Sequence, residues 1–473
     1  MNLSGKHVLV LGLGESGLAS ACWCARRGAR VRVADTRETP PNLDELKRRV
    51  ASADFSMADF NEHFDKSLLD GIDLVVLSPG LSGGLMIVTH ARAAGIPVAG
   101  EIELFARGLR RLQPHVPLLA ITGTNGKTTT TALTGHLLQA TGKTVGVAGN
   151  ISPAALQALM DFEDSGRLPD VWVLELSSFQ LETTQTLDAA AATVLNISED
   201  HLDRYINVEE YASVKARIFD SASDARGVQV LNRDDARVRA MQRNDRRIIS
   251  FGLDAPAGID DFGLRANRGE LWLVQGEHFL LPVSALPISG LHNAANAMAA
   301  LALCHALGYE AKKLLPALRS FSGLPHRVQK VAEINGVSWF DDSKGTNVGA
   351  TVAALEGIGG QLSADKSDRK IVLIAGGQGK GQDFSPLRRA VGRHARAVVL
   401  IGRDAPLIER ALIDVGVPLG HADSMDAAVT CAQGLARSGD AVLLSPACAS
   451  FDMFRNYPHR GQVFVAAVRS LPC

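Results

Sequence analysis

The sequence predicts an α/β protein of three domains built on mainly parallel sheets. Its 473 residues exceed what a single hydrophobic core organises, and length alone suggests about three domains. Short apolar strands recur along the chain, and many are followed by a glycine turn and a helical stretch, which is the pattern of strand–helix–strand units. Glycine is abundant, with 45 residues, whereas aromatic residues make up only 5% of the chain, which favours tight strand-to-helix turns.

Composition narrows the functional class. Lys and Arg total 49 and Asp and Glu total 50, without a basic block, so we expect no nucleic-acid partner. No apolar run reaches the roughly 18 to 20 residues of a membrane span, and Glu15 and three glycines interrupt the apolar stretch 8–24 that superficially resembles a signal peptide. The six cysteines lack paired spacing, which indicates reduced thiols. These features predict a cytoplasmic enzyme that binds no membrane, and we expect it to be a monomer.

The first segment, expected at 1–100, has the pattern of a Rossmann-like domain. An apolar strand precedes the turn Gly12-x-Gly14-x-x-Gly17, a helix follows, and a second strand ends at Asp35. This arrangement matches the dinucleotide-binding fingerprint, including its acidic residue. Taken alone, the segment therefore favours a nicotinamide-dependent oxidoreductase.

The second segment, expected at 101–323, contains a parallel sheet followed by a small antiparallel sheet. Apolar strands are predicted at 117–123, 144–149, 171–176, 191–197, 228–232 and 247–252. Residues 263–283 alternate apolar and polar side chains across glycines, which predicts an antiparallel hairpin, and a long helix follows at 292–308.

The third segment is expected at 324–473. The turn-forming stretch Ser322-Gly323-Leu324-Pro325 marks its boundary with the second segment. Three short apolar strands, at 370–377, 397–402 and 441–446, alternate with helical stretches. This pattern predicts a separate, smaller parallel sheet.

A phosphate-binding loop with shortened spacing follows the first strand of the central segment. The common pattern G-x-x-x-x-G-K-[ST] requires glycine where Ile121 stands, and the nearest upstream glycine is Gly123. The strand before the loop and the helix after it supply the expected context. Gly123 and Gly126 would let backbone N–H groups approach phosphate, Lys127 would neutralise it, and Thr128 could offer its hydroxyl to magnesium.

Further candidate groups follow neighbouring strands. Glu175 ends the strand 171–176, at the edge where parallel sheets present functional groups, although strand-end glutamates are also common on ordinary surfaces. His201 follows the next strand among three carboxylates, a mixture suited to metal binding or substrate positioning. Lys215 by itself has the pattern of a solvated helix lysine.

Eight motifs in order along the chain resemble the Mur ligase family. They are TGTNGKTTT, GNISPA, LELSSFQLE, NISEDHLDRY, GLHNAANA, LPHRV, DDSKGTN and SPACASFDMFRNY. The resemblance spans essentially the whole chain and includes the short phosphate loop as a family trait. It implies a Rossmann-like domain for a UDP sugar, a central domain for ATP and a Rossmann-like C-terminal domain for the amino acid. It is closest to members that use ATP and two Mg²⁺ ions to add D-glutamate to UDP-N-acetylmuramoyl-L-alanine, through an acyl phosphate, in peptidoglycan synthesis.

The resemblance also implies roles for matching residues in the central and first domains. The catalytic residues are Lys127, Glu175, His201 and Lys215. The magnesium ligands are Thr128, Glu175, His201 and, when it is carbamylated, Lys215. The ATP-binding residues are Gly123, Thr124, Asn125, Gly126, Lys127, Thr128, Thr129, Asn296, Arg327 and Asp342. The residues for the UDP substrate are Leu13, Glu15, Ser16, Asp35, Thr36, Arg37, Ser78, Gly80, Asn150, Ser177 and Gln180.

The third group of matching residues is implied to bind glutamate. Its members are Lys344, Thr346, Lys380, Ser450, Phe451 and Tyr457. A lysine with hydroxyl and backbone donors is what a dicarboxylate requires. Gln378 replaces a common aspartate and Tyr457 a common phenylalanine, so the details of this pocket depart from the family pattern. The D configuration of glutamate is implied by the resemblance alone.

Three alternatives explain less of the sequence. An oxidoreductase accounts for the Gly12 turn and Asp35 but leaves the phosphate loop and its acids unexplained. A ligase of the same fold could add another amino acid, or glutamate to a folate, but the UDP-like first domain and the last motif disfavour folate. A non-catalytic nucleotide-switched scaffold would have no use for a second metal site.

Overall fold

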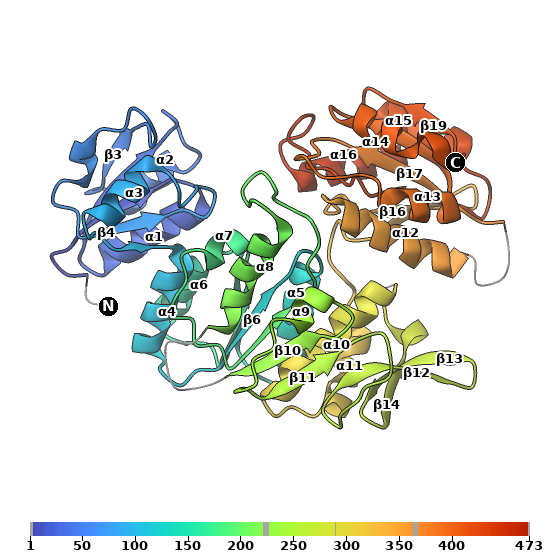
Figure 1. The fold of residues 1–473 in the computed structure, drawn as a ribbon, viewed down its shortest axis with the longest axis horizontal. Helices are drawn as coiled ribbons and strands as arrows, with labels where there is room; N and C mark the ends of the chain where they lie inside the picture. Colours follow the sequence, from blue (N-terminus) through green and yellow to red (C-terminus); the bar gives the residue numbers. More distant parts are fainter. Residues whose placement is uncertain (1–2, 221–226, 289, 363–367, 472–473) are drawn as a thin grey trace.

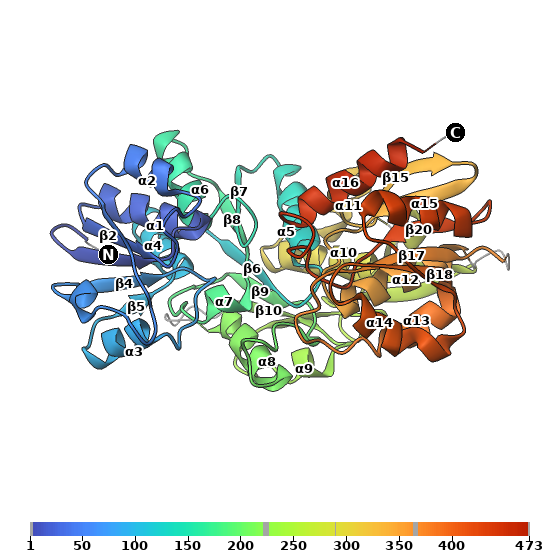
Figure 2. The same ribbon diagram turned by 90° about the horizontal axis from the view of Figure 1, so that it is seen from above.

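Three α/β lobes follow one another along the chain (Figure 1). The structure, a computed structural model, describes residues 3–220, 227–288, 290–362 and 368–471. Each lobe is organised on one sheet, of five, nine and six strands in turn. In the second view the first and third lobes lie at opposite ends of the molecule with the central lobe between them (Figure 2). The α/β class and the three-lobe order predicted from the sequence are confirmed.

The first lobe contains the predicted strand–helix–strand unit. Its five strands, in the order β3-β2-β1-β4-β5, all pair in parallel. The turn needs its glycines, because Gly12 has φ of +86° and a Cβ on Gly17 would lie 1.9 Å from the Gly12 carbonyl oxygen. The elements are β1 (His7–Leu11), α1 (Glu15–Arg26), β2 (Arg30–Asp35), α2 (Leu43–Arg49), β3 (Asp54–Met57), β4 (Leu74–Leu77), α3 (Met86–Ala93) and β5 (Val98–Ala99).

The central lobe combines parallel and antiparallel strands in one sheet of order β14-β13-β12-β11-β10-β9-β6-β8-β7. The predicted antiparallel part has three strands and continues the parallel part through one residue pair, Phe251 with Phe262. The strands are β6 (Leu118–Thr122), β7 (Val145–Gly149), β8 (Val171–Glu175), β9 (Ala191–Val194), β10 (Val228–Asn232), β11 (Ile248–Phe251), β12 (Phe262–Asn267), β13 (Glu270–Gln275) and β14 (His278–Pro282).

Helices cover this sheet, and the predicted long helix is α10, which packs against α5. The helices of the lobe are α4 (Glu101–Leu112), α5 (Lys127–Gln139), α6 (Ala155–Asp164), α7 (Ser178–Leu181), α8 (Val208–Ala216), α9 (Ala236–Arg239), α10 (Leu291–Ala306) and α11 (Ala311–Ser320).

The third lobe has a larger sheet than the sequence predicted. The three predicted strands are β17 (Ile371–Gly376), β18 (Ala395–Ile401) and β20 (Ala441–Leu444), and all are buried. The sheet order β15-β16-β20-β17-β18-β19 adds β15 (Gln329–Ile334), β16 (Val337–Asp341) and β19 (Leu419–His421). β15 and β19 escaped prediction because they are partly exposed edge strands without an apolar run.

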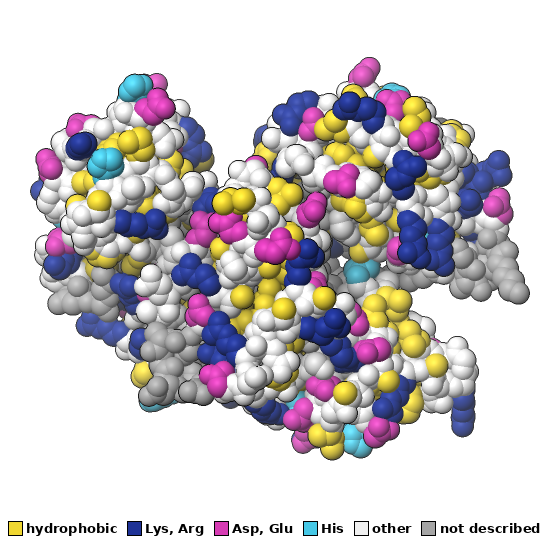
Figure 3. All heavy atoms as spheres, in the orientation of Figure 1, with side chains coloured by type: hydrophobic (Ala, Val, Ile, Leu, Met, Phe, Trp, Pro, Cys, Tyr) yellow, Lys and Arg dark blue, Asp and Glu magenta, His cyan; other side chains and the backbone are white. Residues whose placement is uncertain are grey.

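Five helices flank the third sheet. They are α12 (Val348–Leu362), α13 (Leu387–His394), α14 (Ala405–Leu412), α15 (Met425–Leu435) and α16 (Tyr457–Arg469). The face of the molecule drawn in Figure 3 intersperses Lys and Arg with Asp and Glu, as the balanced composition predicts. Among the described residues, none of the helices has the length and hydropathy of a membrane span. Five of the six cysteines are free thiols, and Cys473 lies outside the described residues.

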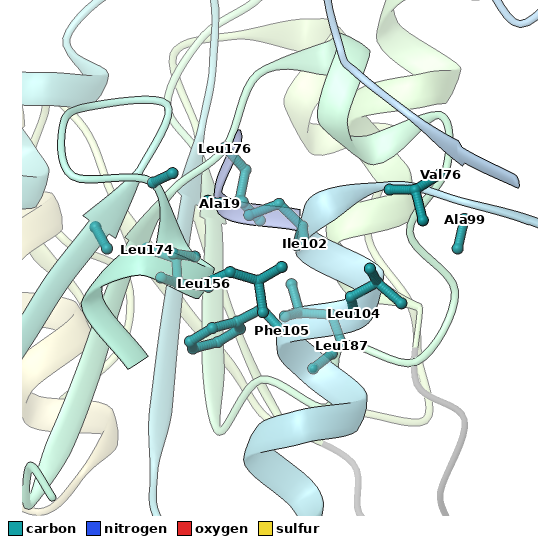
Figure 4. Packing of buried hydrophobic residues seen from close by; sticks show 14 of the residues in the cluster. Ala19, Val76, Ala99, Ile102, Leu104, Phe105, Leu156, Leu174, Leu176 and Leu187 are labelled. Carbon is teal, nitrogen blue, oxygen red and sulfur yellow. The ribbon is translucent and has the colours of Figure 1, made fainter. Parts of the chain in front are cut away.

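The first and central lobes share one apolar core. In this core Phe105 of α4 lies edge-on to Trp172 of β8, with ring centroids 5.0 Å apart, and Trp23 of α1 belongs to the same buried cluster. Figure 4 shows side chains of this cluster from both lobes, among them Ala19, Val76, Ala99, Phe105, Leu156 and Leu174. The buried apolar clusters of the third lobe contain only its own residues. The first two lobes are therefore packed as one body, whereas the third has a core of its own.

Replacing Phe105 by alanine tests the importance of this shared core. We expect the Phe105→Ala substitution to lower the free energy of unfolding by about 3–5 kcal/mol, because it leaves a cavity beside Trp172. Urea unfolding followed by tryptophan fluorescence measures the change. Phe279→Ala is the control, since this phenylalanine is exposed. Equal effects of the two substitutions would contradict the shared core.

Candidate active site

A tight loop between β6 and α5 forms the centre of the site. Gly123 and Gly126 have φ of +146° and +84°, which other residues rarely adopt. A Cβ on Gly126 would also lie 2.3 Å from the Asn296 side-chain oxygen. Lys127 Nζ donates to the carbonyl oxygens of Gly123 and Thr124, at 2.9 and 2.8 Å. The glycine loop thus leads directly into the N-terminus of α5 and keeps Lys127 beside it, which is the arrangement that binds phosphate.

A cavity of about 530 Å³ opens in front of this loop, and residues from the central and third lobes line it. Fifteen predicted site residues line it together: Thr124, Asn125, Gly126, Lys127, Thr128, Thr129, Asn150, Glu175, His201, Asn296, Arg327, Asp342, Lys344, Thr346 and Lys380. Residues that the sequence analysis did not assign also line it, among them Asn196, Ser198, Asn232, Asp234, His292, Asn293 and Asn347. Asn196, Ser198, His292, Asn293 and Asn347 lie within the quoted family motifs, which was the signal that could have found them, whereas Asn232 and Asp234 lie outside those motifs.

Glu175 lines this cavity and keeps one carboxylate oxygen without a hydrogen-bond partner among the described residues. Its Oε1 accepts a hydrogen bond from Asn150 Nδ2 at 2.9 Å, while Oε2 is buried and has no partner among the described residues. A carboxylate oxygen of this kind fits magnesium, which prefers oxygen ligands and completes its shell with water and phosphate. The described residues contain no group of three or more His, Cys, Asp or Glu side chains that could hold a metal ion by themselves. Magnesium would therefore need Thr128, substrate oxygens or a modified lysine in addition.

His201 lies beside the same cavity in a left-handed backbone conformation, with φ of +56°. Its Nε2 lies 3.7 Å from Asp200 Oδ2, and its ring meets the Phe179 ring edge-on at 4.7 Å. Burial lowers the pKa of His201 from its ordinary value. The imidazole is therefore favoured in the neutral form, which can accept a hydrogen bond or bind a cation.

Lys215 is buried, so the prediction from its sequence pattern, a solvent-exposed lysine on a helix, was wrong. Only 1% of the residue is exposed, because α8 directs it behind the phosphate loop. Nζ lies 3.3 Å from Thr122 Oγ1 and 4.6 Å from the centre of the Tyr211 ring. Burial, with Lys127 nearby, lowers the pKa of Lys215 well below its ordinary value. A neutral amine is nucleophilic, which is the condition for reaction with carbon dioxide.

The third lobe brings charged groups to the opposite wall. Burial raises the pKa of Asp342 to about 7, and its carboxylate accepts a hydrogen bond from Ser445 Oγ at 2.7 Å. Lys344 Nζ lies 4.0 Å from the centre of the Tyr457 ring. Asn347 Nδ2 donates to Asn125 Oδ1 of the phosphate loop at 3.0 Å, so the third lobe directly contacts that loop.

Three residues predicted to bind glutamate do not line the cavity. Ser450 is buried in the turn after β20, Phe451 is 70% exposed, and the ring of Tyr457 lies against Lys344, which lines the cavity. Gln378, the residue that departs from the family pattern, exchanges two backbone hydrogen bonds with Ala449 beside this turn. The structure thus groups Lys344, Thr346 and Lys380 and leaves the other three apart.

A second cavity, of about 350 Å³, lies in the first lobe at the glycine turn. The predicted residues that line it are Glu15, Ser16, Asp35, Thr36, Arg37, Ser78 and Gly80, and Phe60, Pro79 and Leu81 join them. Asp35 is buried, but hydrogen bonds from Arg37 and the Leu13 N–H outweigh that burial and lower its pKa to about 2. Leu13 itself is buried and takes part through its backbone.

Three residues predicted for the UDP substrate lie elsewhere. Asn150 lines the larger cavity, and Ser177 and Gln180 cap α7 by reciprocal hydrogen bonds and line neither cavity. Glu15 lines the smaller cavity but also accepts hydrogen bonds from Ser152 Oγ and Ala154 N, at 2.6 and 3.1 Å. It therefore joins the first lobe to the N-terminus of α6.

Comparison with known proteins identifies the class. Family models described as Mur ligase MurD-like N-terminal domain, Mur ligase middle domain, and Mur ligase glutamate ligase domain match residues 6–100, 121–304 and 326–448. The chain belongs to the Mur ligase family.

Individual relatives narrow the resemblance within the family. Proteins named UDP-N-acetylmuramoylalanine–D-glutamate ligase are 58% identical in Aromatoleum aromaticum and 54% identical in Ralstonia nicotianae, each alignment covering 99% of this chain and 98% of the relative. Among solved structures, UDP-N-acetylmuramate-alanine ligase MurC from Thermotoga maritima has a TM-score of 0.60 at 20% identity, covering 98% and 99% of the two chains. MurF from Acinetobacter baumannii has a TM-score of 0.62 at 16% identity, covering 99% of this chain and 91% of its own. These structures share the fold.

The ionisation of Lys344 provides a test of the site electrostatics. Burial, with Arg327 nearby, lowers the pKa of Lys344 to about 8. The buried charge of Lys344 destabilises the folded state. This destabilisation should fall as pH rises from about 8 towards about 10.4, the pKa of lysine in the unfolded chain, because the folded state releases the proton first. Competitive acetylation across this range, read by mass spectrometry, should give a midpoint near 8, with exposed Lys313 as the internal standard for reagent. A midpoint at the ordinary lysine value would contradict the burial of this charge.

Proposed function

We propose that the chain is an ATP-dependent acid–amino-acid ligase that adds D-glutamate to UDP-N-acetylmuramoyl-L-alanine and forms ADP. The name shared by near-full-length relatives at 51–58% identity supports the substrates. The single structural observation that carries the proposal is the larger cavity, where a phosphate loop, the free oxygen of Glu175 and the lysines of the third lobe meet. The reaction belongs to cytoplasmic peptidoglycan synthesis.

Each lobe has one substrate in this proposal. The first, residues 1–100, binds the UDP sugar at the glycine turn, where Arg37 and the N-terminus of α1 face the smaller cavity. The central lobe, residues 101–323, binds ATP at the phosphate loop. The third lobe, residues 324–473, binds glutamate through Lys344, Thr346 and Lys380, and Ser450, Phe451 and Tyr457 remain the further candidates from the sequence.

The first step activates a carboxylate, because its oxygen is otherwise a poor leaving group. The carboxylate of UDP-N-acetylmuramoyl-L-alanine attacks the γ-phosphate of ATP, forming an acyl phosphate and releasing ADP. Lys127 and the backbone N–H groups before α5 stabilise the charge on the transferred phosphoryl group.

The second step forms the amide bond. The glutamate amine attacks the acyl carbon, and a tetrahedral intermediate expels phosphate. Lys344 and Lys380 hold the two carboxylates of glutamate. Contact between Asn347 and Asn125 keeps the third lobe against the phosphate loop, which helps to exclude water from the acyl phosphate.

The metal ligands in this proposal are Thr128, Glu175, His201 and Lys215. Reaction of the neutral Lys215 amine with carbon dioxide forms an N–C bond and releases one proton, which converts the amine into a carbamate with two oxygens. Two bound Mg²⁺ ions would neutralise phosphate charge.

Phosphate release tests the substrates. With ATP, Mg²⁺ and UDP-N-acetylmuramoyl-L-alanine, we expect release with D-glutamate and little with L-glutamate or other amino acids. Release that favours another amino acid would reassign the third substrate, and no release with any amino acid would defeat the proposal.

The roles of Lys127 and Glu175 can be separated from folding. We expect Lys127→Ala and Glu175→Gln to lower kcat by about 10²–10³-fold. Each substitution removes a group that stabilises charge on the transferred phosphoryl group, Lys127 directly and Glu175 as a magnesium ligand. Lys143→Ala is the matched control, since this lysine lies on the surface before β7. Normal ADP release by either site variant, with unchanged unfolding midpoints, would remove that residue from the mechanism.

Lys215→Ala should be severely impaired and partly rescued by acetate or formate, because a small carboxylate can replace the carbamate oxygens. Acetate should not accelerate the wild-type protein. Unchanged activity of the variant, without an effect of acetate, would eliminate the proposed metal-binding role.

A further inference from the structure

Arg204 joins the central lobe to the loop that lines the smaller cavity. It belongs to the segment that carries His201, and its side chain reaches across the lobe boundary. Nη1 donates to the Pro79 carbonyl oxygen at 3.2 Å, and Nη2 donates to the Leu81 carbonyl oxygen at 2.9 Å. Pro79 and Leu81 both line the cavity at the glycine turn.

The guanidinium is held from behind by a carboxylate and an aromatic ring. Glu182, just after α7, accepts from Nε at 3.0 Å and from Nη2 at 2.6 Å, which is a two-point ion pair. Tyr205 OH donates to the same carboxylate at 2.7 Å. The guanidinium carbon lies 4.2 Å from the centre of the Phe179 ring. With only 13% of its side chain exposed, Arg204 has little freedom to leave this position.

The loop that Arg204 contacts is held from the other side by the glycine turn. Ser78 Oγ donates to the Gly12 carbonyl oxygen at 2.9 Å, and Leu81 N donates to the Ser78 carbonyl oxygen at 3.0 Å. The carbonyl groups of Pro79 and Leu81 accept hydrogen bonds from the central lobe. The shape of the smaller cavity at this wall thus depends on a side chain from another lobe.

The same arginine is tied to the wall of the larger cavity. Its backbone N donates to the His201 carbonyl oxygen at 2.9 Å, and Phe179, on which the guanidinium stacks, contacts the His201 ring. The turn that places His201 therefore also places the guanidinium against the first lobe.

We propose that Arg204 is a positioning residue for the nucleotide-sugar substrate, holding the loop 78–81 in the form that binds it. The inference rests on the proposed function for the identity of that ligand. A planar guanidinium donates to two carbonyl groups and a carboxylate at once, and the point charge of lysine does not reproduce that geometry.

Direct binding tests the inference without requiring turnover. We expect Arg204→Lys to weaken binding of UDP-N-acetylmuramoyl-L-alanine about tenfold in calorimetry, the loss expected when charged hydrogen bonds to the loop disappear. Binding of a non-hydrolysable ATP analogue with Mg²⁺ should stay within about twofold of wild type, because no hydrogen bond of the guanidinium reaches that cavity among the described contacts.

Arg396→Lys is the matched control. Arg396 in β18 also forms a two-point ion pair, with Asp440, donates to a carbonyl oxygen, and has 14% of its side chain exposed. Both variants should lower the unfolding midpoint, but only Arg204→Lys should weaken nucleotide-sugar binding. Glu182→Gln should also weaken nucleotide-sugar binding. The double variant should lose less binding free energy than the sum of the two single losses, because both substitutions disrupt the same Arg204–Glu182 ion pair.

Three results would overturn the inference. They are nucleotide-sugar binding by Arg204→Lys within twofold of wild type, an equal loss in Arg396→Lys, and an equal loss of ATP-analogue binding. Failure of wild-type ligation, in contrast, would count against the proposed reaction and leave the binding comparison to decide the role of Arg204.

Discussion

The parallel register of β6 with β8 and β9 is the constraint on which the larger cavity depends. Ile121 of β6 pairs with Glu175 of β8 and with Thr193 of β9, so the three strands end at nearly the same level. The carboxyl ends of parallel strands lie at one edge of a sheet. The phosphate loop, the carboxylate of Glu175 and the turn that carries His201 therefore converge, although about 80 residues of chain separate the first from the last.

Burial determines the chemistry at this edge. Lys127, Lys215 and Lys344 all have lowered pKa values, in each case chiefly because burial disfavours the charged amine, and burial raises the pKa of Asp342 to about 7. Charged groups kept from water are costly unless they find partners. A substrate rich in phosphate supplies such partners, so groups that are unfavourable in the protein alone become useful when the nucleotide binds.

The two lobe boundaries differ physically. The first and central lobes share an apolar core, and ion pairs of Arg26 and Arg27 with Glu163 reinforce it. The third lobe keeps its own cores and meets the phosphate loop through polar contacts such as Asn347 with Asn125. Apolar burial holds two surfaces together more strongly than isolated polar contacts exposed to water. The smaller cavity and the phosphate loop are thus built into one body, whereas the third lobe has a core of its own.

Local patterns were enough to predict the α/β class, the three segments and the places of the phosphate loop, Glu175 and the Gly12 turn, because apolar strands and glycine turns are signals that a short stretch of chain carries. They missed β15, β16 and β19, whose pairing depends on neighbours rather than on an apolar run. No local pattern predicted that Lys215 is buried, that Ser177 and Gln180 cap a helix, or that Arg204 reaches the first lobe. Those outcomes depend on contacts between residues far apart in the chain, and the burial they create, rather than residue type, sets what each side chain can do.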